Sequence, residues 1–111
     1  METPLQITFR GFEHTPELDQ FIRRRAAELE EVAGNRLTSC HVVVELGHKH
    51  IPGARMFHAR IDLSLPGGVI AINREPQDQH LHEDAHVAVR DAFDAAHHQI
   101  QDWERRHHGV A

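Results

Sequence analysis

The fold of this chain is decided by one segment, Phe57-His58-Ala59-Arg60-Ile61-Asp62-Leu63-Ser64-Leu65-Pro66-Gly67-Gly68. Apolar and polar side chains alternate strictly from Phe57 to Leu65, which is typical of a strand with one buried face. Pro66-Gly67-Gly68 then forms a tight connection into a second apolar run at residues 69–73. Residues 57–73 are therefore predicted to form a β-hairpin.

Two further strands and two helices are predicted around this hairpin. Residues 5–10 and 40–46 alternate between apolar and polar side chains, as strands do. A helix is expected to start at Thr15-Pro16, because threonine is a good N-cap and proline suits the first helical position, and to end at Gly34-Asn35. A second helix is expected from Asp84, with its apolar residues on one stripe: Val89, Ala92, Phe93, Ala96, Ile100 and Trp103.

The predicted element order is β-α-β-β-β-α. It favours an α+β fold, a two-layer sandwich in which a four-stranded sheet carries two helices on one face and leaves the other face open. At 111 residues the chain is expected to be a single domain, 1–111, with an ordered core at about residues 4–106.

Composition excludes several classes of protein. No apolar run approaches the roughly 20 residues of a membrane span, and residues 1–4 lack the basic and apolar regions of a secretory signal. Cys40 is the only cysteine, so an internal disulfide cannot form, and a reducing compartment is expected. These features predict a cytoplasmic protein that does not associate with a membrane.

The charge balance depends strongly on pH. Twelve Lys and Arg residues against 17 Asp and Glu give a formal net charge of −5, but the chain also holds 12 histidines. Protonation of all of them would move the formal charge to +7. With a reference histidine pKa of about 6.5, roughly 10% of imidazoles are charged at pH 7.5 and about 75% at pH 6. The sign of the net charge therefore changes within the physiological range.

Four ordered stretches together resemble the family of ribosome hibernation-promoting factors and ribosome-associated inhibitors, also called sigma-54 modulation proteins. They are Ile7-Thr8-Phe9-Arg10-Gly11 with Thr15-Pro16-Glu17-Leu18 and Phe21-Ile22, then Arg36-Leu37-Thr38-Ser39-Cys40-His41-Val42-Val43-Val44, then Ala59-Arg60-Ile61-Asp62-Leu63-Ser64-Leu65-Pro66-Gly67-Gly68, and finally Asp84-Ala85-His86-Val87-Ala88-Val89-Arg90-Asp91-Ala92-Phe93-Asp94 with Gln99-Ile100. The resemblance covers roughly residues 5 to 104 and is to the short form of the family, which lacks an added C-terminal domain.

The resemblance implies a fold similar to double-stranded RNA-binding domains and a role in stress and translation regulation. Such a protein would bind small-subunit rRNA in the channel of messenger and transfer RNA and store ribosomes in an inactive state. The small ribosomal subunit would be its partner, with no cofactor and no small-molecule substrate. The expected rRNA-binding residues are basic or histidine side chains: Arg23, Arg24, Arg25, His48, Lys49, His50, Arg90, His97, His98, Arg105 and Arg106.

The chain departs from the family pattern on the second helix. Ala95, His98, Gln101 and Asp102 stand where the family usually has Lys or Arg, and Glu28 stands where a Lys is common. Histidines occupy or extend several of these basic positions. We therefore hypothesise that RNA affinity is proton-gated, because contact with phosphate and protonation of an imidazole reinforce one another.

Other functions are weaker alternatives. The fold could serve as a non-ribosomal module that binds a protein through its open sheet. A His-rich metal site would use His80, His82 and His86, the last two lying four residues apart if the helix begins early. An enzyme is not expected, because outward-facing neighbours on one strand, such as His58 and Ser64, do not converge, and Cys40 faces the core. His58 and Arg60 need no function on an open face.

Overall fold

The computed structural model describes residues 3–48, 55–74 and 84–108. The elements follow the predicted order, with one short 3-10 helix added. They are β1 (Leu5–Arg10), α1 (Pro16–Ala33), η1 (Gly34–Arg36), β2 (Ser39–His48), β3 (Arg55–Leu65), β4 (Gly68–Arg74) and α2 (Ala85–His108).

The four strands form one mixed sheet in the order β1-β2-β3-β4. β1 runs parallel to β2, whereas β2–β3 and β3–β4 are antiparallel. The register aligns Ile7 with Val42, Val42 with Ile61, and Ile61 with Ile72, so one apolar row crosses the whole sheet. The predicted hairpin is confirmed, and Gly67 at its turn has a φ of +90°, which an L side chain rarely adopts.

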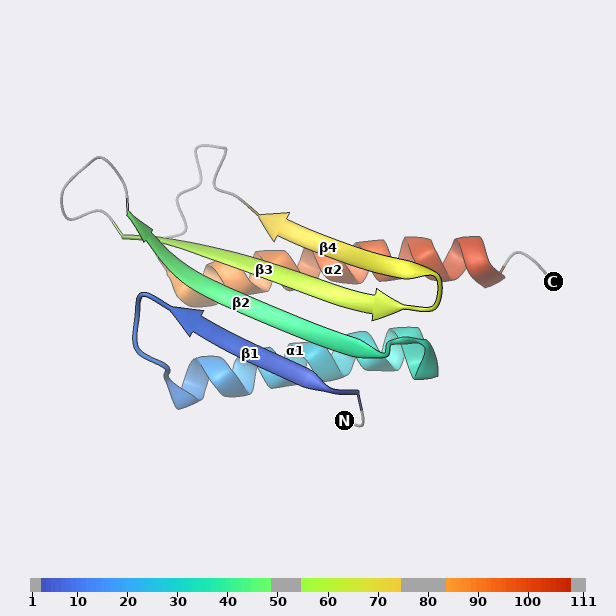
Figure 1. Cartoon of the computed structure of the whole chain (residues 1–111), viewed down its shortest axis with the longest axis horizontal. Coiled ribbons are helices and arrows are strands. Elements are labelled where there is room, and N and C mark those ends of the chain that lie inside the picture. The colour runs from blue at the N-terminus through green and yellow to red at the C-terminus, as the bar shows by residue number, and fades with distance from the viewer. Residues whose placement is uncertain (1–2, 49–54, 75–83, 109–111) are drawn as a thin grey trace.

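Both helices lie on the same face of the sheet, as Figure 1 shows with the sheet in front and the helices behind it. The α1 helix packs against β1 and against α2, and α2 covers β3 and β4. The core between the layers contains alternate strand residues such as Val42, Val44 and Ile61, each fully buried, together with Ile22 and Phe93 from the helices. The predicted two-layer α+β fold is therefore confirmed.

The ends of α1 follow their sequence signals. Thr15 caps the N-terminus: its hydroxyl accepts a hydrogen bond from the Leu18 backbone N–H at 3.3 Å, and Pro16 opens the helix. At the other end, Gly34 has a φ of +63°, and its N–H donates to the carbonyl of Glu30. A left-handed glycine of this kind ends a helix without steric strain.

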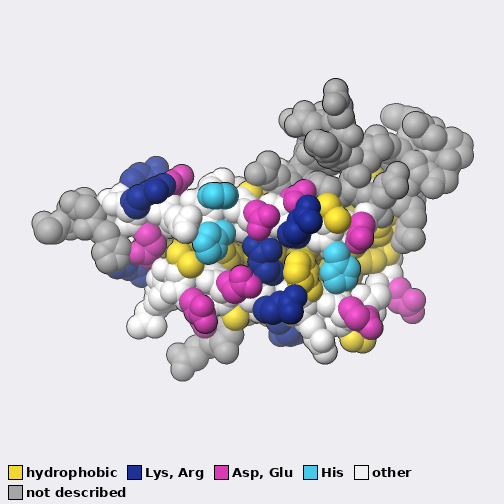
Figure 2. Space-filling model, turned by 180° about the vertical axis from the view of Figure 1, so that it is seen from behind, with side chains coloured by type: hydrophobic (Ala, Val, Ile, Leu, Met, Phe, Trp, Pro, Cys, Tyr) yellow, Lys and Arg dark blue, Asp and Glu magenta, His cyan; other side chains and the backbone are white. Residues whose placement is uncertain are grey.

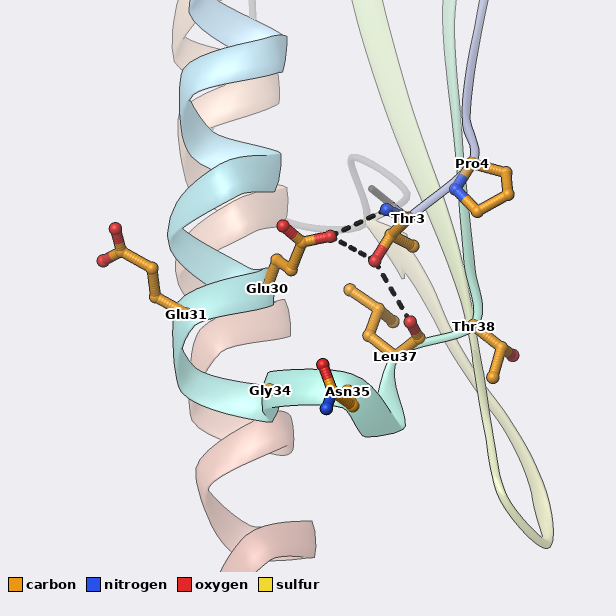
Figure 3. Close-up of a pocket in the computed structure, with 8 residues that line it drawn as sticks. All are labelled: Thr3, Pro4, Glu30, Glu31, Gly34, Asn35, Leu37 and Thr38. Carbon is orange, nitrogen blue, oxygen red and sulfur yellow. Dashed lines mark hydrogen bonds between the residues drawn. The ribbon is translucent and has the colours of Figure 1, made fainter. Parts of the chain in front are cut away.

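The segment before β1 is attached to the end of α1 (Figure 3). The Glu30 carboxylate accepts a hydrogen bond from the Thr3 backbone N–H at 2.8 Å and a second from the Thr3 hydroxyl, which also lies 3.1 Å from the Leu37 carbonyl oxygen. These residues line a hollow of about 570 Å³ beside η1. The contacts fix the start of the edge strand against the helical layer.

Element lengths differ slightly from the prediction. β2 and β3 extend to His48 and from Arg55, because the antiparallel ladder continues through Gly47–Met56 and His48–Arg55. The second helix begins at Ala85 and not at Asp84, whose carboxylate instead accepts a hydrogen bond from the His86 N–H at 2.8 Å. It also runs on to His108, beyond the expected ordered core.

Candidate nucleic-acid interface

The helical side of the molecule carries mixed charge. The sequences of α1 and α2 contain nine carboxylates, six arginines and five histidines, a net charge of −3 when the histidines are neutral. Figure 2 shows this side, with arginine, acidic and histidine side chains interspersed and no extended area of one colour. The predicted basic residues of α1 and α2 therefore share this side with acidic neighbours.

The three arginines of α1 have different surroundings. Arg23 is 59% exposed and pairs with Asp19 at 2.7 Å. Arg24 is exposed, lies 5.5 Å from the centroid of the Phe21 ring, and has no ion pair among the described side chains. Arg25 is only 17% exposed.

The low exposure of Arg25 results from its contact with α2. Its Nη2 donates to Asp94 Oδ1 at 2.7 Å, and its Nε lies 3.7 Å from Glu28 Oε2. The guanidinium also lies 5.8 Å from the centroid of the Phe93 ring. Arg25 thus joins the two helices. The sequence could not indicate this, because Asp94 is 69 residues away.

A hydrogen bond from Arg23, supported by the charges of Arg23 and His14, lowers the pKa of Asp19 from its usual value against the opposing effect of burial. Since His14 also lies 3.2 Å from this carboxylate, Asp19 is the acidic centre of a small cluster at the start of α1. An acid in the first turn also interacts favourably with the helix dipole. This cluster holds Arg23 close to the helix surface.

The α2 residues of the predicted site are exposed but partly neutralised. Arg90 lies 3.2 Å from Asp91, and Arg105 pairs with Asp102. His98 and Arg106 are exposed, without an ion pair in the described part of the chain. The remaining member of this set, His97, is half-buried.

Three other predicted residues come from the last position of β2 and the two positions that follow it. His48 ends β2, and its side chain is outside the described residues, as are Lys49 and His50.

A hollow of about 540 Å³ lies beside the edge strand β1, lined by Thr3, Leu5, Arg23, Arg24 and Ala27. The structure therefore brings Arg23 and Arg24 together at one concave surface.

A second concave surface lies on the open face of the sheet, opposite to the helices. It is a hollow of about 380 Å³ that takes its charged and imidazole side chains from β1, β2 and β3: Arg10, His41, Glu45, His58, Arg60 and Asp62. The strand alternation already placed these side chains outward. What the sequence did not reveal is that the register brings them into one group.

Of the three histidines of the metal alternative, His86 lies within the described residues. His80 and His82 lie outside them, and His86 lies in the first turn of α2, which begins at Ala85. His86 lies against Phe21, with ring centroids 5.3 Å apart. In ranges 3–48, 55–74 and 84–108, no three His, Cys, Asp or Glu side chains are arranged to hold a metal ion.

The surroundings of Cys40 disfavour the thiolate form, which is the nucleophilic form of cysteine. The side chain is buried, and desolvation, with a smaller contribution from Asp62, raises the pKa of its thiol to about 12. Ser64 on β3 accepts a hydrogen bond from the Ser39 hydroxyl at 2.8 Å, whereas His58, six residues away on the same strand, lies 2.6 Å from Asn73. Among the described residues, no histidine is hydrogen-bonded to Ser64 or Cys40. None of the described helices has the length and apolar character needed to cross a bilayer.

Comparison with solved structures shows the same fold in two proteins. The crystal structure of the N-terminal domain of Thermus thermophilus Protein Y has a TM-score of 0.71 and 22% identity, covering 91% of this chain and 98% of that domain. A ribosomal subunit interface protein from Coxiella burnetii has a TM-score of 0.68 and 15% identity, covering 93% of this chain and 99% of that protein. A comparison with curated proteins finds no match.

A family model described as sigma 54 modulation protein / S30EA ribosomal protein matches residues 5–108. The match spans every helix and strand of the fold. It agrees with the resemblance carried by the four sequence stretches. The chain therefore belongs to the sigma 54 modulation protein / S30EA ribosomal protein family.

Proposed function

We propose that this protein is a cytoplasmic translation inhibitor that binds small-subunit rRNA in the channel of messenger and transfer RNA and stores ribosomes under stress. Family membership supports an association with the ribosome. The fold also supports it, since the same fold occurs in a protein described as a ribosomal subunit interface protein.

The observation that carries the RNA-binding part is the adjacent, exposed pair of arginines on α1. Arg23 and Arg24 border one hollow, and Arg24 has no carboxylate partner among the described side chains. An arginine that contacts a phosphate displaces condensed counterions, which is the main source of affinity for RNA backbones. A guanidinium without an ion pair makes this contact without first breaking one, so Arg24 is assigned the largest contribution among the arginines of α1.

Four of the other predicted arginines would bind phosphate in exchange for existing partners. Arg23, Arg90 and Arg105 are more than half exposed, and exposed ion pairs of this kind contribute only about 0–1 kcal/mol. Arg25 is held more tightly between the helices. The proposed binding surface therefore includes Arg23, Arg24, Arg90, Arg105 and Arg106, with Arg25 as a structural support that reaches RNA only if Asp94 releases it.

Histidines would supply further charge on acidification. His98 is exposed on α2, where the family usually has a basic residue, and His97 lies beside it. Protonation of the five histidines of α2 would change the net charge of the two helices from −3 to +2. Binding to subunits is therefore expected to be tighter at pH 6 than at pH 7.5.

The test is co-sedimentation with purified small subunits over a range of salt concentrations, at pH 6.0 and 7.5. The Arg23→Gln/Arg24→Gln double variant should bind about tenfold more weakly, and its log-log salt slope should fall by about 1 to 2. Arg36→Gln removes one positive charge elsewhere on the helical layer and serves as the control, with melting curves to show that each variant is folded.

Two results would contradict the proposal. One is wild-type protein that stays in the supernatant at low salt at both pH values. The other is a double variant that sediments as the control does. Equal affinity at pH 6.0 and 7.5, at matched salt, would remove proton gating while leaving ribosome binding intact.

A further inference from the structure

The open face of the sheet carries a group of charged and imidazole side chains. Alternate residues point away from the helices, because their neighbours Val42, Val44 and Ile61 are buried in the core. The outward residues His41, Glu45, His58, Arg60 and Asp62 come from the two central strands, and Arg10 comes from β1. Val43, at the centre of this face, forms part of the floor of the 380 Å³ hollow.

The strand register places each histidine opposite a carboxylate. Glu45 is directly opposite His58 on one side and opposite Arg10 on the other. His41 is opposite Asp62, which also lies 3.4 Å from Arg60. The remaining polar neighbours are uncharged: Thr8 Oγ1 lies 3.2 Å from His41, and Asn73 Oδ1 lies 2.6 Å from His58.

This arrangement makes the charge of the face depend on the two histidines. With both imidazoles neutral, the two arginines balance Glu45 and Asp62, and this group of side chains has no net charge. With both protonated, the net charge is +2. Each new imidazolium also lies opposite a carboxylate with which it can pair, and pairing of His41 with Asp62 would free Arg60 to bind another anion.

We propose that this hollow is an acid-favoured binding site for the phosphates of single-stranded RNA. The choice of RNA as the anion rests on the proposed function. The evidence for the site itself is the grouping of Arg10, His41, His58 and Arg60 around the hollow.

Three features favour a phosphate polymer as the occupant. Guanidinium and imidazolium groups are all hydrogen-bond donors and match phosphate oxygens. Strands β1 and β3 are separated by two strand spacings, about 10 Å, so Arg10 and Arg60 suit an extended anion better than one small ion. Finally, among the described residues that line this hollow there are two carboxylates to repel a polyanion, whereas the sequences of α1 and α2 contain nine.

The experiment measures binding of a short fluorescein-labelled oligouridylate by fluorescence anisotropy at pH 6.0 and 7.5, at one low salt concentration. The protonated fraction of an ordinary histidine rises about eightfold between these pH values, so wild type should bind at least tenfold more tightly at pH 6.0. His41→Gln/His58→Gln should reduce this gain to less than threefold. Arg10→Gln/Arg60→Gln should weaken binding at least tenfold at pH 6.0.

The control is His86→Gln, which removes an exposed histidine from the helical side and should keep the full pH gain. All variants change exposed or half-exposed side chains, and thermal melting verifies that they are folded. An undiminished pH gain in the histidine double variant overturns the proposal. Unchanged affinity in the arginine double variant also overturns it.

Binding of the same variants to small subunits separates this inference from the proposed function. If wild type binds oligouridylate through Arg10 and Arg60 but does not sediment with subunits, the proposed function fails and the sheet-face site stands. If it sediments with subunits but none of the sheet-face variants alters oligouridylate binding, the proposed function stands and the sheet-face site is rejected.

Discussion

At the scale of single residues, Cys40 shows how burial sets chemical behaviour. The side chain points from β2 into the core, away from solvent. Removing a thiolate from water without a compensating partner is costly, so the proton is retained to a much higher pH. The residue serves as a small core side chain.

The raised thiol pKa predicts a loss of stability at alkaline pH. The pKa is about 12 in the folded protein against an ordinary value of 9.0 for a thiol, so the folded state binds more protons between these values. The contribution is complete below pH 9, and stability should fall by about 1.4 kcal/mol per pH unit above it. Urea unfolding at pH 8 to 10.5 measures this slope.

The chain favours this measurement because it contains no tyrosine and a single lysine, so few other groups titrate in the same range. Cys40→Ala is the matched comparison: it should lose about 1 kcal/mol at pH 8 through the smaller side chain but show a flatter pH dependence. A slope identical to that of the wild type would show that the thiol is not responsible.

At the scale of elements, the ends of α1 were predictable from sequence, because capping depends on residues next to one another. Thr15, Pro16 and Gly34 each act as the local rules predict. The strand alternation likewise predicted which side chains face the core. In contrast, contacts between elements, such as Arg25 with Asp94, depend on packing that no local pattern encodes. The grouping of Arg10 with His58 and Arg60 also depends on strand order and register.

The N-cap of α1 is expected to contribute measurably to stability. Thr15→Ala removes the hydroxyl that accepts from the Leu18 N–H, and should lower the free energy of unfolding by about 1 kcal/mol. Thr15→Ser keeps an acceptor at the same place and should be close to neutral. Urea unfolding of both variants checks this, and an equal loss in the two would argue against the capping interaction.

The Arg25–Asp94 ion pair is expected to couple the two helices weakly. Asp94 is 55% exposed, so solvent screens the pair, and a double-mutant cycle with Arg25→Gln and Asp94→Asn should give about 0.5 kcal/mol at low salt. The coupling should decline with added salt. Strictly additive single-variant effects at low salt would show that the contact does not contribute to stability.

At the scale of the whole molecule, the helical side and the open face of the sheet differ in their balance of basic and acidic side chains. The helical side combines six arginines with nine carboxylates, whereas the open sheet gathers two arginines, two histidines and two carboxylates around one hollow. The formal charge of the chain is −5 with neutral histidines. A protein of this composition approaches RNA against general repulsion at neutral pH, and acidification weakens that repulsion over both faces.

The distribution of ion pairs explains why composition alone gave an incomplete account of the site. The sequence predicted most of the exposed basic residues of the helical side. It did not predict that Arg25 would pair with Asp94, or that Arg24 would have no carboxylate partner among the described side chains. Nor did it predict that the open face would form a second group of cationic side chains. Both results depend on which residues the fold brings into contact.

The central claim is that the protein occupies the channel of messenger and transfer RNA on the small subunit. Its most direct test is competition: purified small subunits, either empty or preloaded with messenger and initiator transfer RNA, are sedimented with the wild-type protein at pH 6.0. The account predicts that the protein pellets with empty subunits and is largely excluded from preloaded ones. Equal pelleting with both, or pelleting with neither, would contradict it.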